Sequence, residues 1–402
     1  MNASTALPAH VPESLVRDFP FAYGRKTQRD PFGDLAAKEH EEAPEIYYAP
    51  QAHLDGTAAW VVRGTQDLRD IFFDTEHFTT ADYTPYSKLI GETWASLPME
   101  SDPPLHTKHR GFINKLFMPQ ALAKLEDDIR ASAIEGIEVF RARGECEFVE
   151  EFALEFPIKV FMRLMGMQPE RLKEFRSWEM GLLHAKNVEE MIDATRNVDA
   201  YLRSEVEDRR HNPKDDLFTY IAQGELDGVP LTEDELVGFA FNLFIGGLDS
   251  VSANLGLQFH HLATYPEHQT RLRAQPEMIP DAIDEFMRAY GALMGHRHCK
   301  KEITIKDVTM KPGDAVVLSA ALAGRDPNEY PNVNEVILDR KPRHLSFGFG
   351  PHLCLGMHLA RRELRIAMEE FLRLIPDFRV APGHKMTYWL GVMQPLELPL
   401  VW

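Results

Sequence analysis

HLSFGFGPHLCLGMHLARRELRIAMEEF, residues 344–371, surrounds one cysteine with three glycines and a proline and then begins a helical pattern. Gly348 and Gly350 allow a tight backbone turn, with positive φ where the turn needs it. Beyond the loop, apolar residues return every three or four positions until Pro376. Cys354 is therefore predicted just before a helix, where N–H groups and the helix dipole stabilise a thiolate.

The local sequence leaves four roles open for Cys354. A buried, inert cysteine has no need of the surrounding glycines. A nucleophile needs a base, and His352, two residues away, rarely reaches a productive geometry in a loop. A zinc site needs further ligands at regular spacing, which the HRHC segment at 296–299 does not provide. A single thiolate ligand to the iron of a haem fits the pattern best.

The composition argues against several classes of protein. The 402-residue chain has a formal net charge of −18, which disfavours nucleic acids and anionic membranes as main partners. Its three cysteines cannot all pair as disulfides, so a reducing, cytoplasmic setting is expected. The N-terminus lacks the charge and apolar run of a signal peptide, and no uninterrupted apolar stretch of about 18 residues predicts a membrane span.

The periodicity predicts a mainly α protein with a minor β part. Residues 105–290 are mostly helical in pattern, whereas residues 57–63, the segment 302–320 and the C-terminal LELPLVW indicate strands. No linker rich in Gly, Ser or Pro marks a boundary. Residues 1–402 are therefore expected to form a single domain, with residues 1–45 as an arm on its surface.

The apolar segment from Thr232 to Pro266 predicts one long, buried helix that begins with a capping box formed by Thr232 and Glu235. Its middle nevertheless carries two glycines, which cost roughly 1 kcal/mol each relative to alanine in a helix. Asp249 and Ser250 follow them. Two explanations remain: a helix crossing that needs small residues, or a distorted turn that opens a groove for a ligand.

FGFGPHLCLG, residues 347–356, resembles the F-x-x-G-x-x-x-C-x-G signature of cytochrome P-450 monooxygenases, and its fixed positions hold Phe347, Gly350, Cys354 and Gly356. EFMR at 285–288 resembles the family's structural E-x-x-R pair, GGLDS at 246–250 its oxygen-activating turn, and DPPLHTKHR at 102–110 its propionate-binding helix. The segments FIGGLDSV, HLARRE and LPLVW are similar to those of the bacterial camphor hydroxylase branch. The resemblance implies the triangular, mostly helical prism fold of the cytochrome P-450 family.

The resemblance also implies a cofactor, haem b (iron protoporphyrin IX), with Cys354 as the axial ligand of its metal. Two buried propionates need cationic donors. Gly295 replaces an acid of the camphor hydroxylase, so this part of the propionate network is altered. The cofactor-binding residues implied by the resemblance are His106, Arg110, Arg297, Phe347, His352, Cys354 and Gly356.

Asp249 and Ser250 are the implied catalytic residues and would manage protons, since an acid beside a hydroxyl can relay them through water. Most of the family has threonine where Ser250 stands. Serine keeps the hydroxyl, but it is freer at χ1 and can bond its own backbone. We therefore expect turnover to persist with more leakage to peroxide.

The expected substrate is a small to medium hydrophobic molecule of terpenoid or norisoprenoid ketone type. Trp94 stands where the camphor hydroxylase has a tyrosine that donates to the substrate ketone, and an indole N–H can still donate. Asn242 would add a polar group to an apolar wall. A mobile lid is expected near residues 82–95 and 170–210. The predicted wall consists of Trp94, Leu97, Met99, Asn242, Leu243, Ile245, Gly246, Leu293 and Val392.

The chain has no nucleotide, flavin or iron–sulfur motif, and the resemblance implies a 2Fe–2S ferredoxin and an NADH-dependent ferredoxin reductase as electron donors. A monomer is expected. The alternative is a haem-thiolate sensor or binding protein without monooxygenase turnover, but the sequence shows no DNA-binding or signalling domain for a sensor. Candidates for a local basic patch facing an acidic ferredoxin are Lys108, Arg110, Lys115 and Arg343.

Overall fold

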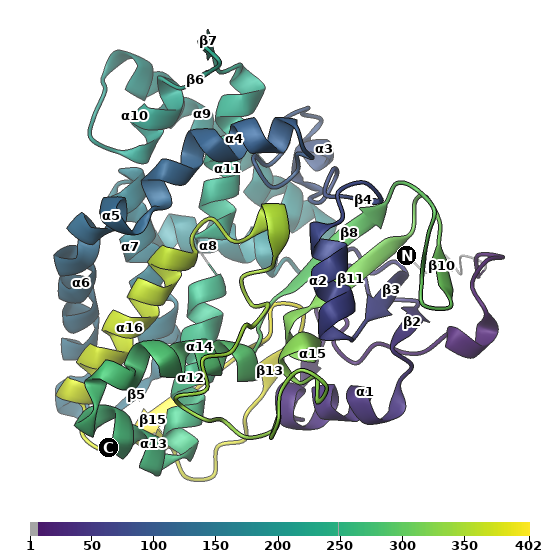
Figure 1. The fold of residues 1–402 in the computed structure, drawn as a ribbon. Helices are drawn as coiled ribbons and strands as arrows, with labels where there is room; N and C mark the ends of the chain where they lie inside the picture. Colours follow the sequence, from purple (N-terminus) through teal and green to yellow (C-terminus); the bar gives the residue numbers. More distant parts are fainter. Residues whose placement is uncertain (1–6, 248) are drawn as a thin grey trace.

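The computed structural model describes residues 7–247 and 249–402. Most helices gather on one side of the molecule, and the largest sheet lies with the N-terminal segment on the other (Figure 1). This arrangement confirms the predicted mainly α protein with a minor β part. The helices are α1 (Ala37–Glu42), α2 (Thr65–Phe73), α3 (Tyr86–Ile90), α4 (Leu105–Asn114), α5 (Pro119–Leu122), α6 (Glu126–Glu138), α7 (Glu155–Met165), α8 (Leu172–Leu183), α9 (Val188–His211), α10 (Leu217–Ala222), α11 (Glu233–Gly246), α12 (Ser250–Thr264), α13 (Pro266–Ala274), α14 (Ile279–Ala289), α15 (Ala320–Gly324) and α16 (Met357–Leu374).

The largest sheet has its strands in the order β2 (Ile46–Ala49), β3 (Ala59–Val62), β11 (Ala315–Ser319), β8 (Met294–Cys299) and β4 (Phe78–Thr79). β11 runs parallel to β3 and antiparallel to β8. β3 confirms the strand predicted near residue 60, and every residue of β2 and β3 is buried. The remaining strands are β1 (Lys26–Thr27), β5 (Glu145–Glu147), β6 (Glu225–Leu226), β7 (Val229–Pro230), β9 (Ile303–Ile305), β10 (Val308–Met310), β12 (Arg379–Val380), β13 (Tyr388–Trp389), β14 (Gln394–Pro395) and β15 (Pro399–Val401).

The long apolar segment forms two helices, α11 and α12, instead of one. At its start the predicted capping box is present, because the N–H of Glu235 donates to Thr232 Oγ1 (3.3 Å) and the N–H of Thr232 donates to the Glu235 carboxylate (2.8 Å). The helix is interrupted at the predicted place, and residue 248 in this break lies outside the described residues. By length and hydropathy alone, residues 233–264 are the one candidate membrane span among the described residues, but 71% of the most apolar window is buried inside the protein.

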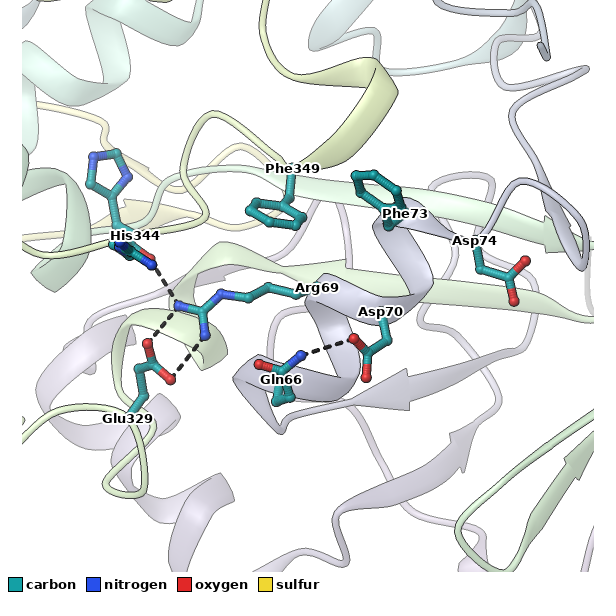
Figure 2. A pocket seen from close by; sticks show the side chains of 9 residues that line it. Gln66, Arg69, Asp70, Phe73, Asp74, Glu329, His344 and Phe349 are labelled. Atoms are coloured by element: carbon teal, nitrogen blue, oxygen red, sulfur yellow. Dashed lines mark hydrogen bonds and ion pairs between the residues drawn. The ribbon is translucent and has the colours of Figure 1, made fainter. Parts of the chain in front are cut away.

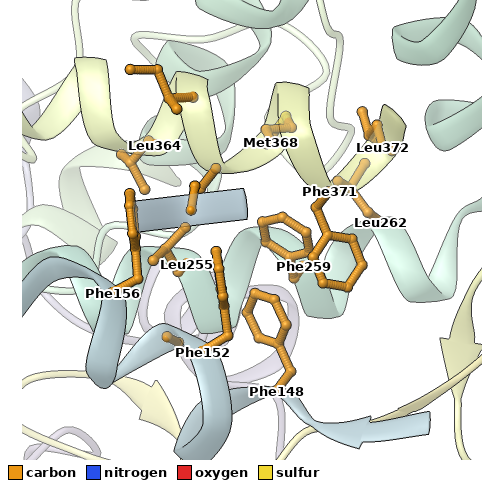
Figure 3. Close-up of a cluster of buried hydrophobic side chains, with 14 of the residues drawn as sticks. Phe148, Phe152, Phe156, Leu255, Phe259, Leu262, Leu364, Met368, Phe371 and Leu372 are labelled. Carbon is orange, nitrogen blue, oxygen red and sulfur yellow. The ribbon is translucent and has the colours of Figure 1, made fainter. Parts of the chain in front are cut away.

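An aromatic cluster joins α12 to α16 (Figure 3). The ring centroid of Phe259 in α12 lies 4.4 Å from that of Phe148 and 4.9 Å from that of Phe371 in α16. Each fully buried ring of this size stabilises the fold by about 1.5–3 kcal/mol. Since α12 begins directly after Asp249 and α16 follows the cysteine loop, this packing holds the two segments singled out by the sequence in a defined arrangement.

The charged pair of the EFMR segment is buried in α14. Arg288 Nε and Nη2 donate to the two carboxylate oxygens of Glu285 at 2.8 Å, and both side chains have 0% exposure. Arg288 Nη1 also donates to the backbone carbonyls of Gly324 and Val333, and Arg340 Nε donates to Glu285 at 3.0 Å. Every charge therefore has the partners that a buried ion needs, which supports the structural role predicted for the pair.

The N-terminal arm is anchored in the core. Phe21 and Phe32 are almost fully buried in a cluster with Leu257 of α12 and Leu322 of α15. These aromatic side chains belong to the cluster on the face of α12 that carries Leu257, whereas the face with Phe259 belongs to the cluster that Cys354 contacts. That residues 1–45 form an arm on the surface stays a prediction.

Candidate active site

The cysteine loop turns twice through left-handed backbone. Gly348 and Gly350 both have a φ of 71°, and a Cβ on Gly350 would lie 3.1 Å from the carbonyl oxygen of Phe72. Only glycine adopts this conformation there without strain. The N–H of Cys354 closes the loop by donating to the carbonyl of Phe347 at 2.9 Å. The predicted position of Cys354 directly before a helix is confirmed.

The thiol of Cys354 is free. Burial raises its pKa, whereas the N–H groups of Gly356 and Met357 and the charges of Arg110 and Arg361 act to lower it. Such donors stabilise a thiolate and tune a metal that it binds. Among the described residues, no group of three or more His, Cys, Asp or Glu side chains could hold a metal ion. A zinc site is therefore not found there, and the single-thiolate interpretation remains.

Two arginines and two histidines converge close to this loop: His106 and Arg110 of α4, Arg297 of β8, and His352. The ring centroids of the two histidines lie 4.2 Å apart. Burial and the charge of Arg110 lower the pKa of His106 to about 4, and burial and the charge of Arg297 lower the pKa of His352 to about 3. Burial also lowers the pKa of both arginines.

No member of this cluster is paired directly with an acid, and Asp102, whose charge acts on His106, Arg297 and His352, is itself paired with Lys300. In the described part of the chain, none of the four side chains forms an ion pair, and the buried Nε2 of His106 has no hydrogen-bond partner. Buried positive charge without an acid is costly. The arrangement therefore fits an anionic ligand that carries more than one negative group.

Asp249, at the break between α11 and α12, is buried between two partners. Gln394 Nε2 donates to its Oδ1 at 3.0 Å, and His184 Nε2 lies 3.2 Å from its Oδ2. No hydrogen bond joins Asp249 to Ser250 within the described residues, so the structure does not bring these two predicted side chains into direct contact. Gly246, at the end of α11, borders open space, because a Cβ there would meet no atom within 4 Å.

The residues predicted to line the substrate site divide by burial. Trp94, Leu97 and Leu243 are buried. The other predicted residues keep part of their surface exposed, as expected for residues that line the wall of a ligand site. These accessible residues are Met99, Asn242, Ile245, Gly246, Leu293 and Val392.

Trp94 is buried, and its indole N–H already has a partner in the protein. Its indole Nε1 donates to Asp199 Oδ1 of α9 at 2.9 Å, and its ring centroid lies 4.4 Å from that of Phe241. The larger bicyclic ring reaches a carboxylate on the neighbouring helix and is closed off in the core. The indole N–H is therefore engaged by Asp199 in this structure, and the role of Trp94 in substrate binding stays a prediction.

Comparison with known proteins gives a consistent result. A family model described as Cytochrome P-450 matches residues 161–388, more than half of the chain. The probable cytochrome P-450 127A1 of Sinorhizobium fredii is 35% identical over 382 residues, which are 94% of this chain and 92% of that protein. The chain belongs to the cytochrome P-450 family. It is therefore an oxidoreductase of a monooxygenase family.

Solved structures confirm the fold of this P-450. The crystal structures of CYP101J2 and CYP101C1 match with TM-scores of 0.88 and 0.86 at 28% and 31% identity, and each comparison covers 99% of this chain and 100% of the other. The predicted triangular prism fold is thus confirmed, and these neighbours support the resemblance to the camphor hydroxylase branch.

The family's cofactor is haem b, and the residues of this P-450 fit it. Haem b needs one axial ligand and counter-charges for two propionates. The chain offers the Cys354 thiol with N–H donors around its sulfur. It also offers two arginines and two histidines that are buried or half-buried and form no ion pair with a described residue, and His106 Nε2 has no hydrogen-bond partner. Phe347 is buried beside the loop, with the Arg361 guanidinium 4.6 Å from its ring centroid.

A cleft of about 780 Å³ lies beside the cysteine loop, between α2 and the turn that contains Phe349 (Figure 2). Two aromatic rings border it, Phe73 with 63% exposure and Phe349 with 38%, and their centroids are 6.3 Å apart. Arg69 pairs with Glu329 and donates to the carbonyl of Arg343. The cleft is lined by Gln66, Arg69, Asp70, Phe73, Asp74, Glu329, Arg343, His344 and Phe349, so acids outnumber arginines.

Two other candidates for a basic patch, Lys108 and Lys115, already contact partners in the protein. Lys108 pairs with Asp227 at 2.5 Å, and the ammonium of Lys115 lies 4.9 Å from the ring centroid of Tyr220. The surface beside the cysteine loop is thus mixed in charge, with exposed aromatic rings as its most distinctive feature.

Proposed function

We propose that this P-450 hydroxylates a small to medium hydrophobic substrate, of terpenoid or norisoprenoid ketone type, with Cys354 as the axial ligand of haem b. The observation that carries the proposal is the free thiol before α16, beside two arginines and two histidines that form no ion pair with a described residue. When bound, haem b supplies the iron at which dioxygen is activated with two electrons. The buried Asp249 next to Ser250 favours this enzyme over a haem-thiolate sensor, which would not need a proton donor there.

In this proposal the cationic cluster orients the cofactor. His106, Arg110, Arg297 and His352 bind the two propionates, which supply the guanidinium groups of Arg110 and Arg297 with the paired negative charge that burial makes favourable. Arg297 is the most constrained of them, because it is buried in β8 and its Nη1 already donates to the carbonyl of His296 at 2.7 Å. Arginine suits a carboxylate because its donors form a planar fork.

The substrate would bind along α11 and the loops facing it. The accessible wall residues are apolar except for Asn242. This residue lies half-buried on α11, and its side chain makes no hydrogen bond to a described residue. Since Trp94 is engaged with Asp199, we assign the hydrogen bond to the substrate oxygen to the Asn242 amide. Segments 82–95 and 170–210 would form the lid over this site.

Electrons would come from a 2Fe–2S ferredoxin that is reduced by an NADH-dependent reductase. We propose that the ferredoxin docks beside the cysteine loop, with Phe73 and Phe349 at the centre of the contact and Arg343 at its edge. Exposed aromatic rings are typical centres of protein interfaces. We further propose that residues 1–402 act as a single domain, as a monomer in the cytoplasm.

The test is a turnover experiment with labelled oxygen. Ketones that shift the haem absorption on binding are incubated with the P-450, a ferredoxin, its reductase and NADH under oxygen-18 gas. The proposal expects one labelled oxygen atom per product molecule and no product without ferredoxin. Binding without any labelled product would reject the monooxygenase and favour the binding protein.

A further inference from the structure

Residues 91–97, which follow α3, are fastened to α9 by two of their side chains. The indole Nε1 of Trp94 donates to Asp199 Oδ1, and Arg203 Nη2 donates to the Glu92 carboxylate, both at 2.9 Å. Arg203 Nε also donates to Asp199 Oδ2 at 2.9 Å, one helical turn along α9. The four side chains therefore form one continuous hydrogen-bonded connection between this segment and the helix.

The two ends of this connection differ in burial. Trp94 is 1% exposed and Asp199 is 9% exposed, whereas the side chains of Arg203 and Glu92 are 33% and 40% exposed. An exposed ion pair contributes little, because water and salt screen it. A buried hydrogen bond to a charged acceptor is stronger, and breaking it leaves an unpaired donor in apolar surroundings. The contact between Trp94 and Asp199 therefore carries most of the attachment.

The backbone of the same segment is fixed to α11. The N–H of Leu97 donates to the carbonyl of Gly238 at 3.1 Å, and a Cβ on Gly238 would lie 2.1 Å from the carbonyl oxygen of Ala95. Only glycine permits this close approach. The Glu100 carboxylate also accepts the N–H of Ser96 at 2.7 Å. These contacts hold the segment on α11, so α9 is the partner from which it can separate.

Two further side-chain contacts of this region do not reach α9. The hydroxyl of Tyr86 in α3 donates to the carbonyl of Leu182 in α8 at 3.3 Å, which is a long bond between neutral groups. Thr93 Oγ1 donates to Asp234 of α11 at 2.7 Å, and this bond is exposed. Thr93 thus lies beside Trp94 in the chain but connects to the helix that already holds the backbone, which makes it a matched control.

We propose that Asp199 is a positioning residue that holds residues 91–97 against α9 and thereby limits how fast bulky ligands enter and leave the substrate site. The inference rests on the proposed function, because it takes Trp94 and Leu97 as part of the wall of that site. The contact consists of protein atoms alone, so it opens for entry and for release alike. Its loss should therefore raise both rates and leave their ratio, the dissociation constant, nearly unchanged.

The test uses two ligands of the haem iron that differ in size. Stopped-flow absorption measures association and dissociation of 4-phenylimidazole with the ferric holoprotein and association of carbon monoxide with the ferrous holoprotein. The inference expects Asp199→Ala and Trp94→Phe to raise both 4-phenylimidazole rates at least about fivefold, because a buried hydrogen bond to a charged group is lost. The carbon monoxide rate and all rates in Thr93→Val should stay at wild-type values. Asp199→Asn, whose amide oxygen still accepts the indole N–H, should fall between the wild type and Asp199→Ala.

The double variant separates the hydrogen bond from a passage opened by the smaller ring of phenylalanine. If the bond limits the rates, Asp199→Ala adds nothing to Trp94→Phe, because each substitution removes the same contact. Effects that multiply in the double variant, a raised carbon monoxide rate, or unchanged 4-phenylimidazole rates in Asp199→Ala would overturn the inference. Because these rates require haem but no turnover, the inference can fail while the monooxygenase reaction is present. A colourless wild-type protein would reject the proposed function and the inference together.

Discussion

The imidazole rings of His106 and His352 face each other with centroids 4.2 Å apart, although one residue belongs to α4 and the other to the cysteine loop. Two histidines and two arginines meet at this point; none of them forms an ion pair with a described residue, although the charge of Asp102 acts on His106, Arg297 and His352. A bound anion would stabilise the two arginines, because a buried guanidinium without a paired acid is costly. The cluster connects a loop defined by local glycine geometry to a helix and a strand that are distant in sequence.

The first prediction concerns this cluster. Arg297→Gln should weaken haem retention, because a hydrogen bond to a charged group contributes about 1.5–3 kcal/mol. We expect haem transfer to an excess of apomyoglobin to become at least about tenfold faster. The control is Arg25→Gln, since Arg25 is exposed and its guanidinium contacts only a glutamine side chain. Equal transfer rates for the two variants would remove Arg297 from the propionate site.

The second prediction concerns the pair of Glu285 and Arg288. Glu285→Gln leaves a buried guanidinium without its carboxylate and should lower the free energy of unfolding by about 3–5 kcal/mol. Urea unfolding followed by circular dichroism measures this. The exposed pair of Arg141 and Glu138 gives the control, because Glu138→Gln should cost at most about 1 kcal/mol. Similar losses in both variants would contradict the structural role assigned to the buried pair.

The third prediction concerns Ser250. Ser250→Thr should raise the amount of product formed per NADH consumed, because the β-methyl group restricts χ1 and leaves the hydroxyl fewer orientations than it has in serine. Peroxide release should fall in parallel. Ser252→Thr, two residues further along α12, tests whether any added methyl group has the same effect. Equal coupling in the wild type and Ser250→Thr would show that serine manages protons as well as threonine does.

The fourth prediction is a pH dependence of stability. Burial, with the charges of His268 and His260, lowers the pKa of His261 to about 3. The unfolded chain therefore binds the proton first as pH falls below about 6.5, and stability decreases by about 1.4 kcal/mol per pH unit until about pH 3.

Replacing His261 by glutamine removes this titration and keeps a hydrogen-bonding group near Tyr290 and His268, which contact its two ring nitrogens. The loss of stability between pH 7 and pH 5 should shrink by about 2 kcal/mol. The measurement is urea unfolding at both pH values, with the exposed His211→Gln as control. An unchanged pH dependence would place the pKa of His261 near its ordinary value.

Local signals in the sequence predicted much of the fold and part of the site. The glycines at 348 and 350 require positive φ, and the capping box at Thr232 and the glycines before Asp249 mark where the central helix begins and breaks. Each of these features depends on neighbours a few residues away. These local features can therefore be predicted without knowledge of the tertiary structure.

Side-chain contacts between residues distant in the sequence could not be predicted in the same way. Asp249 contacts His184 and Gln394, and the indole of Trp94 contacts Asp199. These partners are far apart in the sequence, and helical or strand periodicity does not predict such contacts. The resemblance predicted a donor role for Trp94 from its position alone. In the structure the indole N–H donates to Asp199, a partner 105 residues away in the sequence.

The proposed function depends most on the bond between Cys354 and the iron of haem b. The absorption spectrum of the reduced, carbon monoxide-bound protein tests it directly, because thiolate ligation shifts the main haem band strongly to longer wavelength. We predict this shifted band for the wild type and its loss in Cys354→His, with the control Cys146→Ser unchanged. A colourless wild-type protein, or a shifted band that survives in Cys354→His, would contradict the account.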